Sequence, residues 1–348
     1  MRIAFVIDPI RLERPRATTL VLARTARARG HDVFLLEVDE MTCSADGRVG
    51  GRAHAVPEDP MPSTEALLEA VREADRPRPV VSSASLDVLW LRYNPAECGL
   101  DRRWAAQTGI RLAQLALRRD DILVLDHPDT LAWAESKLYL NHLPGRIRPH
   151  TLVTRDLETI DRFHREHGRI VLKPLGGYGG RGVVRVEPRD TNLHSLVDLL
   201  AADDFIIAQE YVPAAEHGDI RLFMMNGRPL ADDDGRIAAI RRVSGEDDFR
   251  GNMTAGATAR AVHVDATLFG LADAAGPALR RDGLFLAGLD IAGDRILEVN
   301  TMTPGGLYSA SLHQERDFGR VVIRAVERKL ERKRSGRAPA NRVLAATD

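Results

Sequence analysis

Residues 288–300 read GLDIAGDRILEVN. Apolar and polar residues alternate on both sides of a Gly-Asp pair, a pattern that predicts a β-hairpin. Glu298 and Asn300 lie two positions apart on one strand, so their side chains share a face. The turn decides where Asp290 points. A two-residue turn at the Gly-Asp pair would send it to the other face, whereas a three-residue loop at 292–294 keeps it on the face of Glu298, and we predict the three-residue loop.

Three oxygen-bearing side chains on one face of this hairpin form a candidate metal site. In that register Asp290 and Glu298 are diagonal neighbours, roughly 7–8 Å apart or less, and Asn300 adds an amide oxygen. Mg²⁺ is a hard cation that prefers such oxygen ligands. A solvated charged face would explain any one of these residues, but it explains all three less well. The hairpin therefore predicts a Mg²⁺ site, with Mn²⁺ as the alternative ion, at Asp290, Glu298 and Asn300.

Upstream of the hairpin, a glycine-rich loop at 176–182 joins two predicted strands, 169–173 and 183–186. Such a loop leaves backbone N–H groups free to approach a polyanion closely. Neither a Gly-Lys-Ser/Thr sequence nor a helix follows it, which excludes a Walker loop and a dinucleotide fingerprint. Because Lys173 comes just before the loop, we interpret it as a flap over phosphates. A flexible hairpin is the alternative.

Basic side chains scattered along the chain are candidate partners for anionic substrates. Arginine offers a bidentate fork to planar acids, and lysine offers a point charge to phosphate. A nucleoside triphosphate and a carboxylate substrate would need both kinds, although each residue taken singly is more often on the surface. The candidates are Lys137, Lys173, Arg221, Arg242 and Arg250.

The N-terminal part of the chain predicts an open α/β domain over residues 1–128. Residues 2–7 have the composition of a buried strand, helix formers at 17–29 end at a glycine, and 31–38 predict a second strand. This β-α-β order implies a parallel sheet with a right-handed crossover. Further elements are expected as strands at 86–91 and 122–126, a helix near 102–118, and a hairpin or loop insertion at 41–62.

The remainder of the chain predicts two further subdomains, giving a mixed α/β (α+β) protein. Domains are expected at 1–128, 129–209 and 210–334, with a disordered tail at 335–348. A basic run at 328–337 is more often a solvated helix end than an anion site. Helices are expected near 130–142, 156–167, 265–281 and 317–334, and strands at 151–154, 205–209, 220–225 and 285–300.

Composition limits the classes of function. The chain has 348 residues, 44% of them hydrophobic, which suits two or three domains. Its 49 basic and 50 acidic residues give a net charge of −1, which argues against a nucleic-acid partner. No run of about 18 apolar residues is present, so no membrane span is expected. Cys43 and Cys98 cannot form a disulfide framework, and we expect a cytoplasmic protein that acts on small molecules.

The order of these motifs resembles the ATP-grasp superfamily. Within it, the chain is similar to the bacterial-type glutathione synthetases, and the similarity extends to the opening residues 6–10. The implied fold is an ATP-grasp fold preceded by an open parallel-sheet (Rossmann-like) domain. The motifs that carry the resemblance are Lys137, 171–182, 208–213, 218–221, 250–252, 288–290 and 297–300.

The resemblance implies a set of ATP-binding residues. Lys137 and Lys173 would bind the phosphates, and Asp219 would contact the nucleotide. The glycine loop would close over the phosphates through Gly177, Gly179, Gly180 and Gly182. A hinge strand would meet the adenine and the ribose through Gln209, Glu210, Tyr211 and Val212.

The resemblance also implies residues for the chemistry. Arg221 and Arg242 would hold the transferring phosphoryl group or the acyl phosphate. Arg250 and Asn252 lie in a stretch, 243–258, that resembles the family's mobile active-site loop. Asp290, Glu298 and Asn300 match the metal ligands of the family.

The segment after Asn300 departs from the family pattern. Thr303 and the following proline fit, and Gly305 and Gly306 could anchor a substrate carboxylate through backbone N–H groups. The Arg-Glu pair that the family usually carries next is replaced by Tyr308 and Ser309. The identity of the acid and amine substrates therefore stays open at this point.

The activity implied by the resemblance is that of an ATP- and Mg²⁺-dependent ligase. A carboxylate attacks the γ-phosphate of ATP to give an acyl phosphate, and an amine then displaces the phosphate. In the glutathione synthetases the acid is γ-glutamylcysteine and the amine is glycine, and the family tends to form homo-oligomers. Two alternatives remain: a related carboxylate–amine ligase with a different acid or amine, and a nucleotide-binding module that has lost catalysis.

Overall fold

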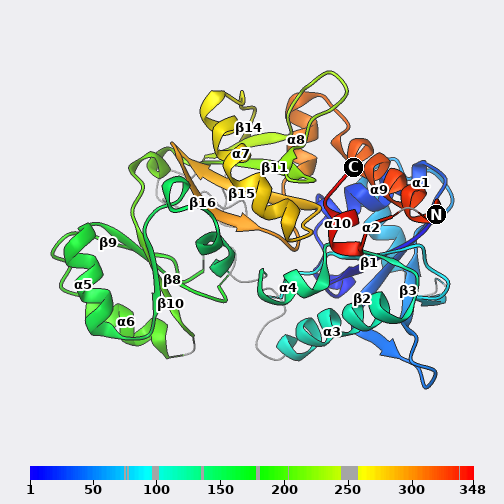
Figure 1. The fold of residues 1–348 in the computed structure, drawn as a ribbon, viewed down its shortest axis with the longest axis horizontal. Helices are drawn as coiled ribbons and strands as arrows, with labels where there is room; N and C mark the ends of the chain where they lie inside the picture. The colour runs from blue at the N-terminus through cyan, green and yellow to red at the C-terminus, as the bar shows by residue number, and fades with distance from the viewer. Residues whose placement is uncertain are drawn as a thin grey trace.

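The fold was analysed in a computed structural model that describes residues 1–73, 76, 78–95, 102–134, 137–177, 181–202, 204–243, 258–336 and 338–348. Three β-sheets organise this part of the chain (Figure 1). The N-terminal sheet and a small sheet drawn in green lie at opposite ends, and the third sheet lies between them. The candidate site is built where the three sheets approach one another.

The N-terminal sheet has six strands in the order β4-β3-β2-β1-β5-β6. Its strands are β1 (Arg2–Ile7), β2 (Asp32–Cys43), β3 (Val49–Ala55), β4 (Val80–Ser82), β5 (Val88–Leu91) and β6 (Leu123–Leu125). β1 pairs in parallel with β2 and β5, and β5 pairs in parallel with β6, as the β-α-β order predicts. The insertion predicted at 41–62 holds the end of β2 and the strand β3, which pair as an antiparallel hairpin, and β4 adds to β3 from outside that range. The helices are α1 (Thr18–Ala28), α2 (Thr64–Arg72) and α3 (Arg103–Arg119).

The second sheet forms a small lid with a hydrophobic core of its own. Its four strands are all antiparallel, in the order β7-β10-β8-β9. They are β7 (Thr151–Thr154), β8 (Ile170–Pro174), β9 (Val184–Val186) and β10 (Ile206–Glu210), covered by α5 (Leu157–His167) and α6 (Leu193–Ala201). The segment before the lid holds α4 (Pro128–Ala134) and the 3₁₀ helices η3 (Lys137–His142) and η4 (Gly145–Ile147).

The third sheet carries the hairpin from which the sequence analysis began. Its order is β14-β13-β11-β15-β16, with β12 paired to β11, and every pairing is antiparallel. The strands are β11 (Asp219–Met225), β12 (Arg228–Pro229), β13 (Ala239–Val243), β14 (Thr258–Arg260), β15 (Leu286–Ala292) and β16 (Arg295–Asn300). The 3₁₀ helix η5 (Pro213–His217) and the helix α7 (Ala266–Arg281) complete this region of the fold, whereas the 3₁₀ helix η1 (Ile10–Leu12) follows β1 in the N-terminal domain.

The last helices return to the N-terminal domain. α8 (Leu307–Gln314) and α9 (Phe318–Arg334) both pack against α1, and the marked chain ends lie on the same side of Figure 1. The apolar residues of α9 recur at helical spacing, so Val322, Ile323 and Val326 face a core shared with β1. The basic residues between them face outward, with the exception of Lys329, which is 1% exposed.

The prediction of a disordered tail at 335–348 is wrong for the residues that the structure describes there. They include a short helix, α10 (Asn341–Ala345), in which Leu344 is 2% exposed. The Asn341 amide donates to the Val124 carbonyl at 2.9 Å and accepts from the Val124 N–H at 3.1 Å, so it covers the edge strand β6. The Lys329 ammonium donates to the Leu344 carbonyl at 3.1 Å. Polar and small residues suggested disorder, but long-range burial holds the segment in place.

Candidate active site

A large cavity of about 760 Å³ lies between the three sheets. The N-terminal domain contributes Asp8 and Arg92 to its wall, the lid contributes Lys173 and Gln209, and the third sheet contributes Asp290. Side chains from parts of the chain that are far apart in sequence therefore meet around one space. A cavity of this size with convergent charged groups is the usual form of a small-molecule site.

The hairpin of β15 and β16 supplies the floor of the cavity, and its register differs from the predicted one. Ala292 pairs with Arg295, so only two residues form the turn, and the predicted three-residue loop is wrong. The register then shifts at Asp290, which pairs with Glu298 and leaves Leu297 as the extra residue of a β-bulge. The bulge therefore returns Asp290 to the face of Glu298, which a two-residue turn alone would not allow.

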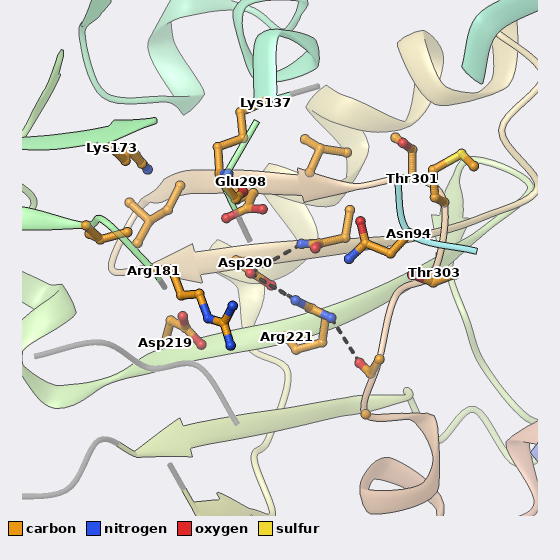
Figure 2. A pocket seen from close by; sticks show the side chains of 18 of the residues that line it. Asn94, Lys137, Lys173, Arg181, Asp219, Arg221, Asp290, Glu298, Thr301 and Thr303 are labelled. Atoms are coloured by element: carbon orange, nitrogen blue, oxygen red, sulfur yellow. Dashed lines mark hydrogen bonds and ion pairs between the residues drawn. The ribbon is translucent and has the colours of Figure 1, made fainter. Parts of the chain in front are cut away.

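Asp290 is the most strongly paired acid of this floor. Its carboxylate accepts from the Arg221 guanidinium through both oxygens, one of them at 3.0 Å, and the Arg242 Nη2 lies 2.7 Å from its Oδ2. The Asn300 amide donates to the same oxygen at 3.3 Å (Figure 2). Burial opposes ionisation, but the two guanidinium groups outweigh it and hold the pKa of Asp290 well below its usual range.

A second acid, Asp219, has a side chain that is 14% exposed and shares one of these cations. Arg242 donates to both oxygens of Asp219, at 2.6 and 2.7 Å, and so bridges Asp219 to Asp290. Burial and the neighbouring Asp290 charge raise the pKa of Asp219 above its usual value, against the pull of Arg242. The fork of an arginine can hold two carboxylates in fixed geometry, which a lysine cannot do.

Two lysines face this floor from the other side of the cavity. Figure 2 shows Lys137 and Lys173 on one side of the hairpin strands, with Arg221 and Asp219 on the other. Lys173 donates to the Gln209 side-chain oxygen at 2.9 Å, and desolvation lowers its pKa to about 8. Lys137 donates to the Gly177 carbonyl, which joins η3 to the glycine loop.

The predicted hinge strand lines one wall of the cavity through Gln209, Glu210, Tyr211 and Val212. The Gln209 amide donates to the Thr151 hydroxyl at 3.2 Å, so its carbonyl is turned to Lys173. A carboxylate oxygen of Glu210 accepts from the backbone N–H of His150 at 3.1 Å. The strand is thus fixed to its neighbours by polar side chains before any nucleotide is bound.

The segment predicted to bind the substrate carboxylate also borders the cavity, at Thr303, Gly305 and Gly306. The Gly305 carbonyl accepts from Arg221 at 2.9 Å, which ties this segment to the paired acids. Gly306 has a φ of 101°, and a Cβ there would approach the Ile240 side chain to 2.9 Å, so glycine is required. The chain then enters α8, a helix that the sequence analysis did not predict.

The remaining predicted residues are placed differently. Gly182 is outside the cavity lining and turns the end of the glycine loop at a φ of 69°. Gly179, Gly180, Arg250 and Asn252 lie outside the described residues, and their roles stay predictions.

Arg92 is a cavity residue that the sequence reasoning missed. It is 1% exposed, donates to the Met302 carbonyl at 3.2 Å and to the Thr19 hydroxyl at 3.4 Å, and lies over the Trp90 ring at 5.6 Å. A signal for it was present, because Arg92 directly follows the parallel strand β5. Ligands of open α/β sheets bind outside the carboxyl ends of such strands. Asn94, which also follows β5, and Arg181, which lies in the glycine-rich loop, are two further residues that Figure 2 shows beside the cavity and that have no predicted role.

The donor set on the hairpin fits a hard divalent cation. Asp290, Glu298 and Asn300 border the cavity from facing strands. Both oxygens of Asp290 already accept from arginines, but a carboxylate has about four lone-pair sites, so an acceptor position remains on it. The site combines two carboxylates with the amide oxygen of Asn300 as the third donor. A group made of three His, Cys, Asp or Glu side chains placed to hold a metal is not found in the described ranges.

Comparison with known proteins decides the family. The model of the prokaryotic glutathione synthetase N-terminal domain matches residues 1–132, and that of the ATP-grasp domain of the same family matches residues 136–314. This chain is a prokaryotic glutathione synthetase family member. It is accordingly an ATP-dependent ligase, and the resemblance seen in the sequence is confirmed.

Curated relatives agree with this assignment to the glutathione synthetase family. The glutathione synthetase of Thermosynechococcus vestitus is 31% identical over 88% of this chain and 93% of its own length. That of Pseudomonas putida is 31% identical over 95% of this chain and 99% of its own length. The matches therefore extend over both the N-terminal and the ATP-grasp domains.

Solved structures show the same fold at lower sequence identity. D-cycloserine synthetase DcsG has a TM-score of 0.62 at 16% identity, covering 95% of this chain and all of its own. The ATP-grasp ligase PsnB, complexed with a minimal precursor, has a TM-score of 0.52 at 22% identity, covering 86% of this chain and 90% of its own. The predicted ATP-grasp fold is thereby confirmed. None of the helices in the described ranges has the length and apolar character needed to cross a membrane.

Proposed function

We propose that this chain joins γ-glutamylcysteine to glycine, with cleavage of ATP to ADP and phosphate. Family membership across both domains supports this proposal. The single observation on which it depends is the shared cavity, where two lysines, arginine–carboxylate pairs and N-terminal residues face the same space. A ligase that joins an acid, an amine and ATP needs all three substrates to meet in one such place.

The residues of the cavity suit an acyl-phosphate mechanism. A carboxylate oxygen of the acid attacks the γ-phosphorus of ATP, and the bond to ADP breaks. The amine nitrogen then attacks the acyl carbon, phosphate leaves and the amine loses a proton. Arg221 and Arg242 would neutralise the transferring phosphoryl group, and Lys137 and Lys173 would hold the phosphates that remain. No protein nucleophile is needed in either step.

A divalent cation completes the proposal. Asp290, Glu298 and Asn300 would hold Mg²⁺, or Mn²⁺ in its place, and the ion would neutralise phosphate charge and orient the triphosphate. The proposal predicts that turnover requires an added divalent ion and is lost on chelation.

Turnover with defined substrates tests the function. The purified protein is mixed with ATP, Mg²⁺, γ-glutamylcysteine and glycine, and the release of ADP and phosphate is measured together with the tripeptide by mass spectrometry. ADP release that requires both the acid and the amine is expected. Binding of ATP without turnover over a broad acid and amine panel would contradict the proposal and would favour a module that has lost catalysis.

A second candidate is a related ligase with a different acid or amine. The observation behind it is Tyr308, which stands where the family usually carries arginine, with the Arg16 guanidinium 5.2 Å over its ring. Arg16 itself borders the cavity. If Arg16 takes the place of the family's arginine beside Tyr308, the cavity would present its positive charge at a different position and would recognise a different substrate carboxylate. Phosphate release over a panel of dipeptides and amino acids distinguishes the two candidates by their kcat/KM.

The quaternary state and the compartment are further parts of the proposal. We expect a homo-oligomer, as the family resemblance implies, and light scattering that gives a monomeric mass would contradict it. We expect a cytoplasmic setting, because the small thiol acid needs reducing conditions. Fractionation of cells that express the chain tests this expectation.

A further inference from the structure

Behind the N-terminal wall of the cavity, Trp90 and Arg92 both act on the buried carboxylate of Asp126. In the described part of the chain the Trp90 Nε1, the Arg92 Nη2 and the Asp126 Oδ2 have no hydrogen bond of good geometry, although the Trp90 side chain interacts with the Asp126 carboxylate as a weak donor. Buried polar groups in folded proteins are nearly always satisfied, so a group of three with such weak hydrogen bonding calls for an explanation. None of the three residues was assigned a role from the sequence.

Asp126 is held firmly although one of its oxygens has no hydrogen bond of good geometry. The residue is fully buried at the end of β6, and its Oδ1 accepts from the backbone N–H groups of Phe285 and Leu286, the latter at 3.1 Å. Leu286 begins β15, the strand that carries Asp290. The Asp126 carboxylate therefore belongs to the N-terminal domain but is anchored to the third sheet.

Arg92 is the cation that Asp126 faces. The charges of Arg92 and Asp126 act on each other, yet no ion pair joins the two within the described ranges. The Trp90 ring lies between the two domains, 5.6 Å from the Arg92 guanidinium and 5.3 Å from the Phe285 ring. Arg92 borders the cavity and Asp126 does not. A charge on Asp126 therefore makes no contact with a substrate, but it changes the electrostatic potential that Arg92 presents to the cavity.

We propose that Asp126 is a positioning residue for the acid substrate, which acts through Arg92 by setting the net charge that the N-terminal wall offers to the substrate carboxylate. An ionised Asp126 offsets the Arg92 charge and repels an incoming anion, whereas a protonated Asp126 leaves the guanidinium uncompensated. The inference rests on the proposed function only in taking the substrate to be a carboxylic acid.

The surroundings of Asp126 place this switch near neutral pH. Burial raises the pKa of Asp126 to about 7, although two backbone N–H groups, Arg92 and the Trp90 side chain oppose the shift. The other charged or titratable groups that act on the pair are Lys329 from α9, the adjacent His127, and Glu13 on the side of Arg92. Because a bound carboxylate is a like charge to Asp126, binding of the acid and protonation of Asp126 favour each other.

Isothermal titration calorimetry tests this linkage directly. γ-Glutamylcysteine is titrated into the full chain with a non-hydrolysable ATP analogue at pH 7.5, in two buffers of different ionisation enthalpy. Net proton uptake on binding is expected, together with a KM for the acid that rises about fivefold or more between pH 6 and pH 8. No proton uptake, or a KM for the acid that is flat over this range, would overturn the inference.

Asp126→Asn separates charge from structure, because the amide oxygen can still accept from both backbone N–H groups. Its KM for the acid is expected to stay low across the pH range, with no proton uptake and with the KM for ATP unchanged. Asp282→Asn is the matched control, since Asp282 accepts from the Tyr139 hydroxyl at the same domain junction, at 2.9 Å. A variant at Asp126 that keeps the wild-type pH dependence of the acid KM would contradict the proposal.

A ligand-free measurement distinguishes failure of the inference from failure of the proposed function. Trp90 lies beside Asp126, so its emission should follow the titration of Asp126, with a midpoint near 7. The step should be absent in Asp126→Asn and in Trp90→Phe. If turnover with γ-glutamylcysteine fails while this step is present, the proposed substrate is wrong and the switch stands; if the step is absent from the wild type, the inference itself is wrong.

Discussion

Asp290 and Glu298 pair directly across β15 and β16, although only two residues turn the hairpin between them. The pairing exists because Leu297 forms a bulge, which moves the register of β16 by one residue after Ile296. Without the bulge the two acids would lie on opposite faces of the sheet. The bulge also brings Leu297 itself into the lining of the cavity.

Glu298 provides the first test of this arrangement. Glu298→Ala is expected to lower kcat on the order of 100-fold, because it removes a carboxylate ligand of the proposed Mg²⁺, which would neutralise charge on the reacting phosphates. The temperature of thermal unfolding should change little, because the Glu298 side chain is half-buried and forms no ion pair within the described part of the chain. Steady-state ADP release over a Mg²⁺ titration measures the effect. Asp294→Ala on the exposed turn is the control, and a Glu298→Ala enzyme as active as this control would contradict the metal assignment.

The shared arginine makes a prediction about stability. Arg242→Ala leaves the largely buried Asp219 without its cation and Asp290 with Arg221 alone, so the free energy of unfolding should fall by about 3 kcal/mol or more. Arg242→Lys keeps the charge but loses the fork, and should recover stability only in part. Urea denaturation measures both. Arg236→Ala, on an exposed turn, should stay within about 0.5 kcal/mol of the wild type.

The pH dependence of ATP use follows from Lys173. Desolvation lowers the pKa of Lys173 to about 8, so its charge is present below that pH and is lost above it. The kcat/KM for ATP, which reports the free enzyme, should therefore fall as the pH rises through 8. In Lys173→Arg the side chain stays charged, so the fall of kcat/KM above pH 8 should be absent, whatever the absolute rate of the variant. If kcat/KM for ATP falls at the same pH in Lys173→Arg as in the wild type, the titration belongs to another group.

Asp126 makes a pH-dependent contribution to stability with a definite sign. Its pKa is raised in the folded state to about 7, so the folded protein binds the proton more tightly than the unfolded chain. This contribution is fully present below the unfolded pKa of about 3.9 and is lost as the pH rises through 7. Between pH 5 and pH 7 the wild type should lose stability relative to Asp126→Asn by at most about 1.4 kcal/mol per pH unit. Urea denaturation of the two proteins at several pH values checks the difference.

The C-terminal residues 338–348 should contribute to the free energy of unfolding. Removal of residues 338–348 exposes the pocket of Leu344 and takes two carbonyl acceptors, those of Leu344 and Thr347, from the buried Lys329. Burial of one leucine contributes about 1.5–3 kcal/mol, and an unsatisfied buried ammonium adds to the cost of truncation. Urea denaturation should show a loss of about 3 kcal/mol or more. In the truncated chain Lys329→Met should restore part of it, and a truncation without effect would contradict the packing described here.

Sequence reasoning succeeded where the information is local. Strands such as β1 and β8 are short apolar runs, and α1 ends at Ala28, two residues before Gly30, so periodicity and caps are enough to place them. The same holds for the site residues that lie in recognisable motifs, such as Lys173 and the pair Glu298 and Asn300. Reasoning of this kind could not find Arg92, because a single arginine after a strand carries no periodic pattern.

The errors have physical causes of a different kind. The three-residue loop was chosen to keep Asp290 beside Glu298, but a bulge reaches the same result with a two-residue turn, and no local pattern distinguishes the two. The composition of the tail predicts disorder, whereas Asn341 and Leu344 find partners on β6 and α9 that are distant in sequence.

By itself the sequence determined the strands and helices with strong periodicity, the family, and most of the charged groups around the cavity, because each of these depends on side-chain type and spacing along the chain. Only the tertiary structure decided that Arg242 bridges Asp219 and Asp290, that Leu297 forms a β-bulge in β16, and that Asp126 lies behind Arg92. Those relationships depend on which surfaces meet across the three sheets, and burial, which sets both the pairing and the pKa shifts, exists only once the chain has folded.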